Sequence, residues 1–359
     1  MSASASQPRR RRVAVLGATG AVGQAFVRLL SDHPWFELVA VAASERSAGR
    51  PYAEATRWIG GAPMPDAVAG MTVVACEPGA VDAEVVFSAL DSSVAGEAEA
   101  AFARAGRMVL SNAKNYRMEP DVPLVAAEVN PEHLALLEVQ RRRRGWSGGI
   151  VTNGNCATIV AVLALAPIHR AFGVKRIFAA TMQAVSGAGY PGVASLDILG
   201  NVIPYIKDEE EKVEEETRKF LGTVDGDQIV MAPIDMSAHT NRVPVEHGHT
   251  VCLSLDLERK ASPDEVRAAL EAWTGAEAAR GLPSSPERAL VVATAPDRPQ
   301  PRRDVDAGGG MTVTVGRVRE DPLFDVKLVA MGHNVIRGAA GASVLNAELL
   351  VAMGLLGAP

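Results

Sequence analysis

The stretch RRVAVLGATGAVGQAFVRLL, residues 11–30, decides the expected fold of the first part of the chain. Its apolar run Val13–Leu16 predicts a strand, and the run that continues to about Leu30 predicts a helix. Three glycines separate the two, and FELVAVAAS, residues 36–44, predicts the next strand. A strand, a glycine turn, a helix and a second strand of these lengths form a βαβ unit.

The glycine turn has the spacing G-x-x-G-x-x-G. In a dinucleotide site Gly17 would make the tight turn, Gly20 would let the backbone approach a phosphate, and Gly23 would let the helix pack on the strand. The start of the helix would then face the pyrophosphate. The same residues also suit an ordinary tight turn, so the turn alone leaves both interpretations open.

Strands and helices continue to alternate after this unit. Residues 84–90 predict a strand, 93–106 a helix and 108–112 another strand. Such alternation is typical of α/β proteins and favours a doubly wound, parallel Rossmann-type sheet.

A charged and then glycine-rich break, RRRRGWSGG at 141–149, indicates a domain boundary. Beyond it the pattern predicts an α+β domain whose sheet is largely antiparallel. We divide the chain into a disordered tail (1–11), a dinucleotide-binding domain (12–148), an α+β domain (149–333) and a C-terminal helix that packs back on the first domain (334–359). The elements expected in the α+β domain are a strand that enters a glycine loop (176–192), an acidic helix (208–221) and strands at 249–258, 290–295 and 311–320.

Length and composition exclude several classes of protein. With 359 residues and a net charge of −6, the chain suits two domains and offers no basic field for nucleic acid. We interpret the arginine runs 9–12 and 141–144 as a solvated tail and an exposed linker. Three cysteines without framework spacing predict a cytoplasmic protein with free thiols. No signal peptide, membrane span or metal site is expected.

A second decisive stretch is VTNGNCATIVAVLALAP, residues 151–167. Cys156 stands at the head of an apolar run, where a cysteine is usually a small buried hydrophobe. Asn155 before it is a good N-cap, which would put the thiol in the first turn of a helix. The helix dipole there favours the thiolate. The position of Cys156 is compatible with both a buried structural cysteine and a reactive thiol.

The end of the second strand separates the two nicotinamide cofactors. NAD sites usually carry an acidic residue there, whereas this chain reads VAASERSAGR. Ser44, Arg46 and Ser47 set a guanidinium between hydroxyls, which suits the 2′-phosphate of NADP. The negative charge of Glu45 is unfavourable beside such a phosphate. We expect NADP.

Several motifs in this order resemble one known family, the aspartate-semialdehyde dehydrogenases of the archaeal and fungal branch. They are GATGAVG, SERSAG, SNAKNYR, NPEHL, GNCAT, TMQAVSGAGYPG, IPYI, EEEKVEEETRK, NRVPVEHGHT, RPQPRRD and IRGAAGASVLNAE. The resemblance covers residues 12–350. It implies a reversible, NADPH-dependent reduction of L-aspartyl 4-phosphate to L-aspartate 4-semialdehyde with release of phosphate. That step feeds lysine, threonine, methionine and diaminopimelate biosynthesis.

The resemblance also assigns roles to residues. Cys156 is similar to the family nucleophile, His249 to its acid/base and Gln183 to the side chain that orients the bound intermediate. The residue after the nucleophile is often Ser or Thr in the family but is Ala157 here. For substrate binding the resemblance implies Arg242 on the α-carboxylate, Glu209 and Lys212 on the amine and phosphate, and Asn112 and Arg117 in the phosphate loop. The implied cofactor-binding residues are Gly17, Thr19, Gly20, Ala21, Val22, Gly23, Ser44, Arg46, Ser47, Ser186, Gly187, Gly189 and Asn334.

Other interpretations of these residues remain open. Without the resemblance, His249 would be an interior histidine and the acidic run at 208–216 a solvated helical face. We take His247 to be exposed. A malonyl-CoA reductase of the same fold and mechanism is the nearest alternative enzyme, and a catalytically silent NADP-binding scaffold is the alternative of another class. The family forms homodimers or homotetramers, and the second domain would then carry both catalysis and dimerisation.

Overall fold

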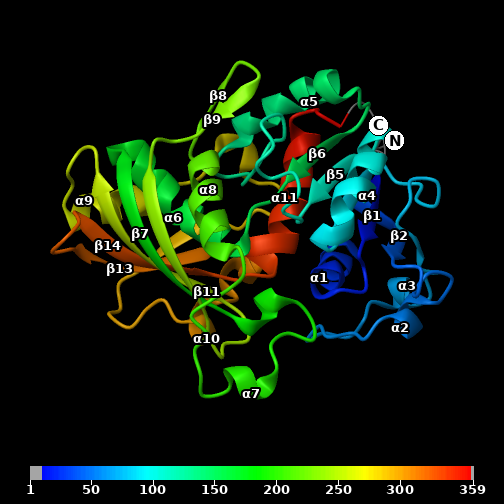
Figure 1. Cartoon of the computed structure of the whole chain (residues 1–359), viewed down its shortest axis with the longest axis horizontal. Coiled ribbons are helices and arrows are strands. Elements are labelled where there is room, and N and C mark those ends of the chain that lie inside the picture. The colour runs from blue at the N-terminus through cyan, green and yellow to red at the C-terminus, as the bar shows by residue number, and fades with distance from the viewer. Residues whose placement is uncertain (1–9, 357–359) are drawn as a thin grey trace, which may run out of the picture.

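The protein, described here by a computed structural model, consists of two sheet-based halves that lie side by side (Figure 1). The structure describes residues 10–356. Most of the predicted N-terminal tail therefore lies outside the described residues. Arg11 and Arg12, which we assigned to that tail, belong to the first strand and form ion pairs with Glu84 and Asp82.

The first half holds a six-stranded sheet in the order β3-β2-β1-β4-β5-β6, and all of its pairings are parallel. Its strands are β1 (Arg11–Leu16), β2 (Phe36–Ala43), β3 (Val74–Ala75), β4 (Val85–Ser88), β5 (Met108–Ser111) and β6 (Gly149–Thr152). Its helices are α1 (Ala21–Leu30), α2 (Tyr52–Ala55), α3 (Asp66–Ala69), α4 (Ser92–Arg104), the 3₁₀ turn η1 (Pro131–Ala135) and α5 (Leu136–Arg144). The predicted doubly wound sheet is confirmed.

The glycine turn after β1 has the geometry that the spacing predicted. Gly17 has a φ of +73°, and a Cβ on Gly23 would come within 2.2 Å of the Gly17 carbonyl oxygen. Only glycine permits both the turn and the close packing of α1 on it. Parallel strands end at one edge of a sheet, so the turn, Asn112 after β5 and Cys156 after β6 are brought to the same edge.

The arginine run is not a linker. Residues 141–144 form the last turn of α5, where Arg144 donates to the Asp121 carboxylate. After residues 145–148 the chain forms β6, which pairs with β5. The first sheet therefore gains a sixth strand beyond residue 148. Our division of the chain at 148/149 stays a prediction.

The second half holds a six-stranded mixed sheet in the order β10-β7-β11-β14-β13-β12. Three of its pairings are antiparallel and two are parallel. Its strands are β7 (Val174–Gln183), β10 (Asp235–Arg242), β11 (His249–Leu257), β12 (Leu290–Ala293), β13 (Val313–Glu320) and β14 (Val326–Gly332), with a separate hairpin of β8 (Thr223–Asp225) and β9 (Gln228–Val230). The short elements around it are η2 (Val185–Ala188), α7 (Ser195–Ile198), α8 (Glu209–Phe220), α9 (Pro263–Ala272), η3 (Glu277–Ala279), α10 (Pro301–Asp304) and η4 (Ala307–Gly310).

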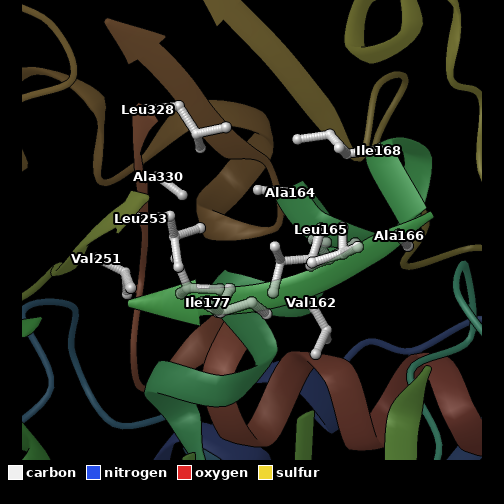
Figure 2. Close-up of a cluster of buried hydrophobic side chains, with 14 of the residues drawn as sticks. Val162, Ala164, Leu165, Ala166, Ile168, Ile177, Val251, Leu253, Leu328 and Ala330 are labelled. Atoms are coloured by element: carbon white, nitrogen blue, oxygen red, sulfur yellow. The ribbon is translucent and has the colours of Figure 1, made fainter. Parts of the chain in front are cut away.

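One helix, α6 (Cys156–Phe172), runs through the interior of the second half. Its sequence is apolar on all sides, and such a helix must be buried on all sides. Figure 2 shows its side chains packed against Ile177 of β7, Leu253 of β11 and Leu328 of β14. The side chain of Asn155 caps it by accepting from the Ala157 and Thr158 N–H groups, as the sequence predicted. The rigid core thereby fixes the position of Cys156.

The last helix that the structure describes packs against the first half. A π-helical turn, η5 (Ile336–Ala340), leads into α11 (Gly341–Ala352), which packs on α1 and on β4 and β5 of the first sheet and lies at the centre of the view in Figure 1. Arg337 in this turn is fully buried and binds both carboxylate oxygens of Glu128. In the part of the chain that the structure describes, no helix has the length and apolar character needed to cross a membrane.

Candidate active site

The thiol of Cys156 and the imidazole of His249 form the centre of the site. The Sγ atom lies 3.1 Å from His249 Nε2. Cys156 begins α6 and His249 begins β11, so two elements far apart in sequence carry the pair. His249 is fully buried, while Cys156 keeps a partial opening to solvent. A thiol beside an imidazole is the arrangement of an activated nucleophile.

The second ring nitrogen of His249 is also occupied. Nδ1 accepts a hydrogen bond from the backbone N–H of Ala184 at 3.0 Å. A neutral imidazole that accepts at Nδ1 carries its proton on Nε2, so the ring donates toward the sulfur. Burial, with Arg242, His333 and His247 nearby, moves the pKa of His249 well below its usual value.

The electrostatics of Cys156 differ from the expectation at a helix N-terminus. Burial raises the pKa of the thiol to about 12, and the Glu209 carboxylate acts in the same direction. Arg242, Arg117 and the Ala157 N–H lower the pKa but do not outweigh burial. Burial therefore favours the neutral form of both the thiol and the imidazole.

Arg242 and Gln183 meet at the end of the parallel strand pair β10·β7, where they stand opposite each other in register. Arg242 is 7% exposed and donates to the Ala184 carbonyl at 2.8 Å. A Cβ on Gly187 would lie 2.9 Å from the Arg242 guanidinium and 3.0 Å from the His249 ring. The glycine therefore lets the loop of residues 185–192 lie directly against Arg242 and His249.

Helix α8 brings a carboxylate and an amine to the same place. Glu209 accepts from the Asn155 side chain at 2.7 Å, and Lys212 lies 3.2 Å from Glu209. The acidic helix is therefore only partly the solvated face that its composition suggested, because Glu209 is buried. Its first turn lies beside the cap of the nucleophile helix.

Arg117 and Asn112 reach the site from the first half. Arg117 donates to the Asn112 carbonyl at 2.6 Å and to Glu216 at 2.9 Å. The Asn112 side chain accepts from Asn153 at 3.1 Å, and Asn153 in turn donates to the Gly338 carbonyl. A Cβ on Gly338 would lie 2.5 Å from that of Cys156, so this network borders the nucleophile directly.

The residues assigned to the cofactor form two groups. Gly17 to Gly23 and the exposed turn Ser44–Ser47 follow β1 and β2 at one edge of the first sheet. On the other side Ser186 accepts from the Asn334 side chain at 2.8 Å. His247, which we took to be exposed, bonds Ser186 at 2.9 Å and stacks on His333.

Sequence reasoning missed three polar residues near the thiol, which are Asn153, Glu216 and Lys219. All three are almost fully buried. A signal existed for Glu216, because it lies seven residues after Glu209 and so two turns along the same face of a helix. The same spacing relates Lys219 to Lys212, whereas Asn153 gave no such signal.

Buried histidines give the fold a pH dependence. Burial lowers the pKa of His133, His169 and His249, and that of His333 to about 4. Their unfolded pKa is about 6.5, so the unfolded chain binds more protons below that value and the native state loses stability as pH falls. Glu99, whose pKa burial raises, opposes this only weakly. We expect the free energy of unfolding to fall between pH 6.5 and pH 4.5, and His333, whose pKa is lowered to about 4, contributes up to about 2.7 kcal/mol of this loss over those two pH units. Denaturant titrations at a series of pH values measure it, and a constant or rising stability would contradict it.

Comparison with known proteins defines the class. The family model described as "Semialdehyde dehydrogenase, NAD binding domain" matches residues 12–137, and "Semialdehyde dehydrogenase, dimerisation domain" matches residues 165–337. The two matches follow the two halves of the fold.

Similarity to individual proteins identifies the family within this class. The aspartate-semialdehyde dehydrogenase of Archaeoglobus fulgidus is 53% identical over 95% of this chain and 98% of its own length. The crystal structure of that enzyme from Candida albicans with NADP has a TM-score of 0.89 at 43% identity, covering 96% of this chain and 99% of that one. Aspartate-semialdehyde dehydrogenase II of Vibrio cholerae, complexed with ASA, has a TM-score of 0.75 at 29% identity, covering 96% and 98%. The chain belongs to the aspartate-semialdehyde dehydrogenase family.

Proposed function

We propose that the protein reduces L-aspartyl 4-phosphate to L-aspartate 4-semialdehyde with NADPH, reversibly, through a thioester on Cys156. The observation that carries this proposal is the Cys156–His249 pair at 3.1 Å, with Arg117 and Arg242 acting on the thiol from different halves. An acyl phosphate with an α-carboxylate presents two anionic groups, and two separate guanidinium groups suit it.

The first sheet fits a dinucleotide. Helix α1 begins at Gly20 without a side-chain cap, so its first backbone N–H groups remain available to a phosphate. Ser44, Arg46 and Ser47 would hold the 2′-phosphate of NADP, and Ser186 and Asn334 would border the nicotinamide. When bound, the cofactor supplies the hydride.

The residues of this chain perform the remaining chemistry. The Cys156 sulfur attacks the acyl carbon, a C–S bond forms, the bond from that carbon to the phosphate oxygen breaks, and the thiol proton leaves with the phosphate. The Asn155 side chain takes up the Ala157 and Thr158 N–H groups, so the backbone N–H of Cys156 itself would stabilise the negative oxygen, by about 2.7–4 kcal/mol for such a donor in comparable sites. His249 serves as the acid through its Nε2 proton, which it donates toward that oxygen, and as the base once Nε2 has given that proton up. Breaking the C–S bond releases the semialdehyde.

One assay tests the proposal. NADP⁺ reduction is followed with aspartate semialdehyde in the presence and absence of inorganic phosphate. We expect turnover that depends on phosphate, because phosphate must cleave the thioester in this direction. Phosphate-independent turnover together with good reduction of a CoA thioester would instead support the malonyl-CoA reductase alternative. The presence of both nucleophile and base argues against a silent scaffold.

The preference for NADP depends on Arg46. Arg46→Ala is expected to weaken NADP binding by about 1.5–3 kcal/mol, roughly 10- to 150-fold, because a charge-assisted contact to phosphate is lost. NAD binding should change little. Fluorescence titration with NADPH and NADH measures both. An equal loss for the two cofactors would separate Arg46 from the 2′-phosphate.

The protein is also proposed to form a homodimer or homotetramer in the cytoplasm. Self-association is supported by the match to the dimerisation-domain family model and by the outer face of the mixed sheet, where Phe178 and Met182 are 38% and 39% exposed. The three free cysteines suit a reducing compartment. Light scattering after size-exclusion chromatography gives the assembled mass.

A further inference from the structure

The carboxylate of Glu216 touches both halves of the molecule. It belongs to α8 and is 1% exposed. Its Oε1 accepts from Arg117 Nη1 at 2.9 Å, and its Oε2 accepts from the backbone N–H of Asn155 at 2.5 Å. One buried anion thus joins the guanidinium assigned to phosphate with the residue that precedes the nucleophile. None of the roles assigned above uses it.

On the Arg117 side the guanidinium is fixed at both ends. Glu216 holds Nη1 and the Asn112 carbonyl holds Nη2. Lys219, three residues further along α8, donates to the carbonyls of Arg117, Glu119 and Val122. The same helix therefore fixes both the main chain and the side chain of Arg117, and neither can shift without breaking a buried charged contact.

On the nucleophile side two carboxylates of α8 hold one asparagine. Glu209 binds the Asn155 side chain and Glu216 binds its backbone N–H. A Cβ on Gly154 would lie 2.5 Å from the Phe220 ring and 3.2 Å from Glu216 Oε2, so the turn is packed tightly on α8. The backbone that precedes Cys156 has no room to move relative to Glu216.

We propose that Glu216 is a positioning residue that sets the separation between the phosphate-binding guanidinium of Arg117 and the sulfur of Cys156. It acts through Arg117 and Asn155 and does not touch the substrate. The inference rests on the proposed function and deepens it, because the attacking atom and the leaving phosphate must be held together when the C–S bond forms. Misplacement of about 1 Å can cost roughly 100-fold in rate.

Glu216 also balances charge. As the ion-pair partner of Arg117 it offsets a positive charge that faces the thiol. Removing the carboxylate therefore stabilises the thiolate of Cys156. The groups that act on the thiol from its surroundings are Glu209 of α8, Arg242 of β10, Arg117 of the loop after β5 and His249 of β11. The proposal thus predicts a more reactive sulfur in a slower enzyme.

The experiment compares Glu216→Gln with Glu214→Gln. Glu214 lies on the same helix and accepts from the Ala238 backbone N–H on β10. Glu214→Gln therefore removes the same charge, and alters the same kind of hydrogen bond, away from the site. For Glu216→Gln we expect turnover to fall at least 10-fold with the KM for semialdehyde within twofold. Glu214→Gln should stay within threefold of wild type in turnover.

Alkylation by iodoacetamide provides a readout that does not require turnover. We expect Cys156 in Glu216→Gln to react at least threefold faster than in wild type at pH 8, with Cys252 of the same protein unchanged by mass spectrometry. Glu216→Asp keeps the charge but is too short to reach both partners, so turnover should fall without faster alkylation. This second variant also serves if the glutamine protein does not fold.

Several results would overturn the proposal. They are turnover of either Glu216 variant within threefold of wild type, an equal loss in Glu214→Gln, or a slow Glu216→Gln enzyme whose Cys156 reacts no faster. A failure of the proposed function looks different, because wild type itself would then lack phosphate-dependent turnover. The alkylation comparison would still report on Glu216.

Discussion

Replacing Cys156 by alanine is expected to abolish turnover, by roughly 1,000-fold or more, while cofactor binding persists. In the proposed mechanism the thiol forms the covalent intermediate, and removing such a group removes the reaction path. The glycine turn and the Ser44–Ser47 turn lie on the first half, whereas Cys156 begins α6 of the second half. Cys156→Ser should retain a trace at most, because a serine hydroxyl is far from ionised at neutral pH. Steady-state assays and NADPH titration measure the two effects.

The matched control is Cys252→Ala. Cys252 lies on β11 within the mixed sheet, and its pKa is raised by burial like that of Cys156. Its removal should leave turnover within twofold. Activity above about a tenth of wild type in Cys156→Ala would remove Cys156 from the role of nucleophile.

The second large effect is a selectivity between two arginines. Arg242→Leu should raise the KM for semialdehyde by about 10- to 150-fold, because one charge-assisted contact of about 1.5–3 kcal/mol is lost. The same substitution should change the KM for phosphate little. Arg117→Leu should do the reverse. The two groups enter from different halves, since Arg242 ends β10 and Arg117 follows β5. Initial rates with each substrate varied in turn measure this.

Equal damage to both KM values in both variants would mean only a disturbed fold. Both arginines are 7% exposed and donate to backbone carbonyls, so either substitution can disturb the fold. A thermal melt of each variant shows whether the fold is disturbed. Arg117→Leu also leaves Glu216 without its cationic partner, so this variant should be the less stable of the two.

The first sheet could be predicted from the sequence because its signals are local. The glycine turn, the apolar strands and the cap at Asn155 each depend on residues a few positions apart. β10 was not predicted, since its sequence DMSAHTNR is mostly polar and becomes a strand only by pairing with β7. Edge strands with polar outer faces depend on their neighbours more than on propensity.

The sequence nominated residues that the structure brings together, but it did not predict their electrostatics. Motifs identified Cys156, His249, Arg242 and Arg117 one by one. The pKa of the thiol was expected to fall, because a helix N-terminus is a local feature, whereas the structure raises it by burial. Glu216 reaches a residue 61 positions away and another 99 positions away, and no local pattern encodes such contacts.

The return of α11 to the first half has a consequence for synthesis on the ribosome. Val344, Leu345, Leu349 and Leu350 belong to the same buried cluster as Phe26 and Phe87. The first half of the nascent chain therefore emerges with this surface uncovered and must wait for about 190 more residues, roughly 10–40 s at ordinary rates of elongation. During that interval Phe26 and Phe87 lack part of their native apolar cover, so the final packing of the first half follows the synthesis of α11.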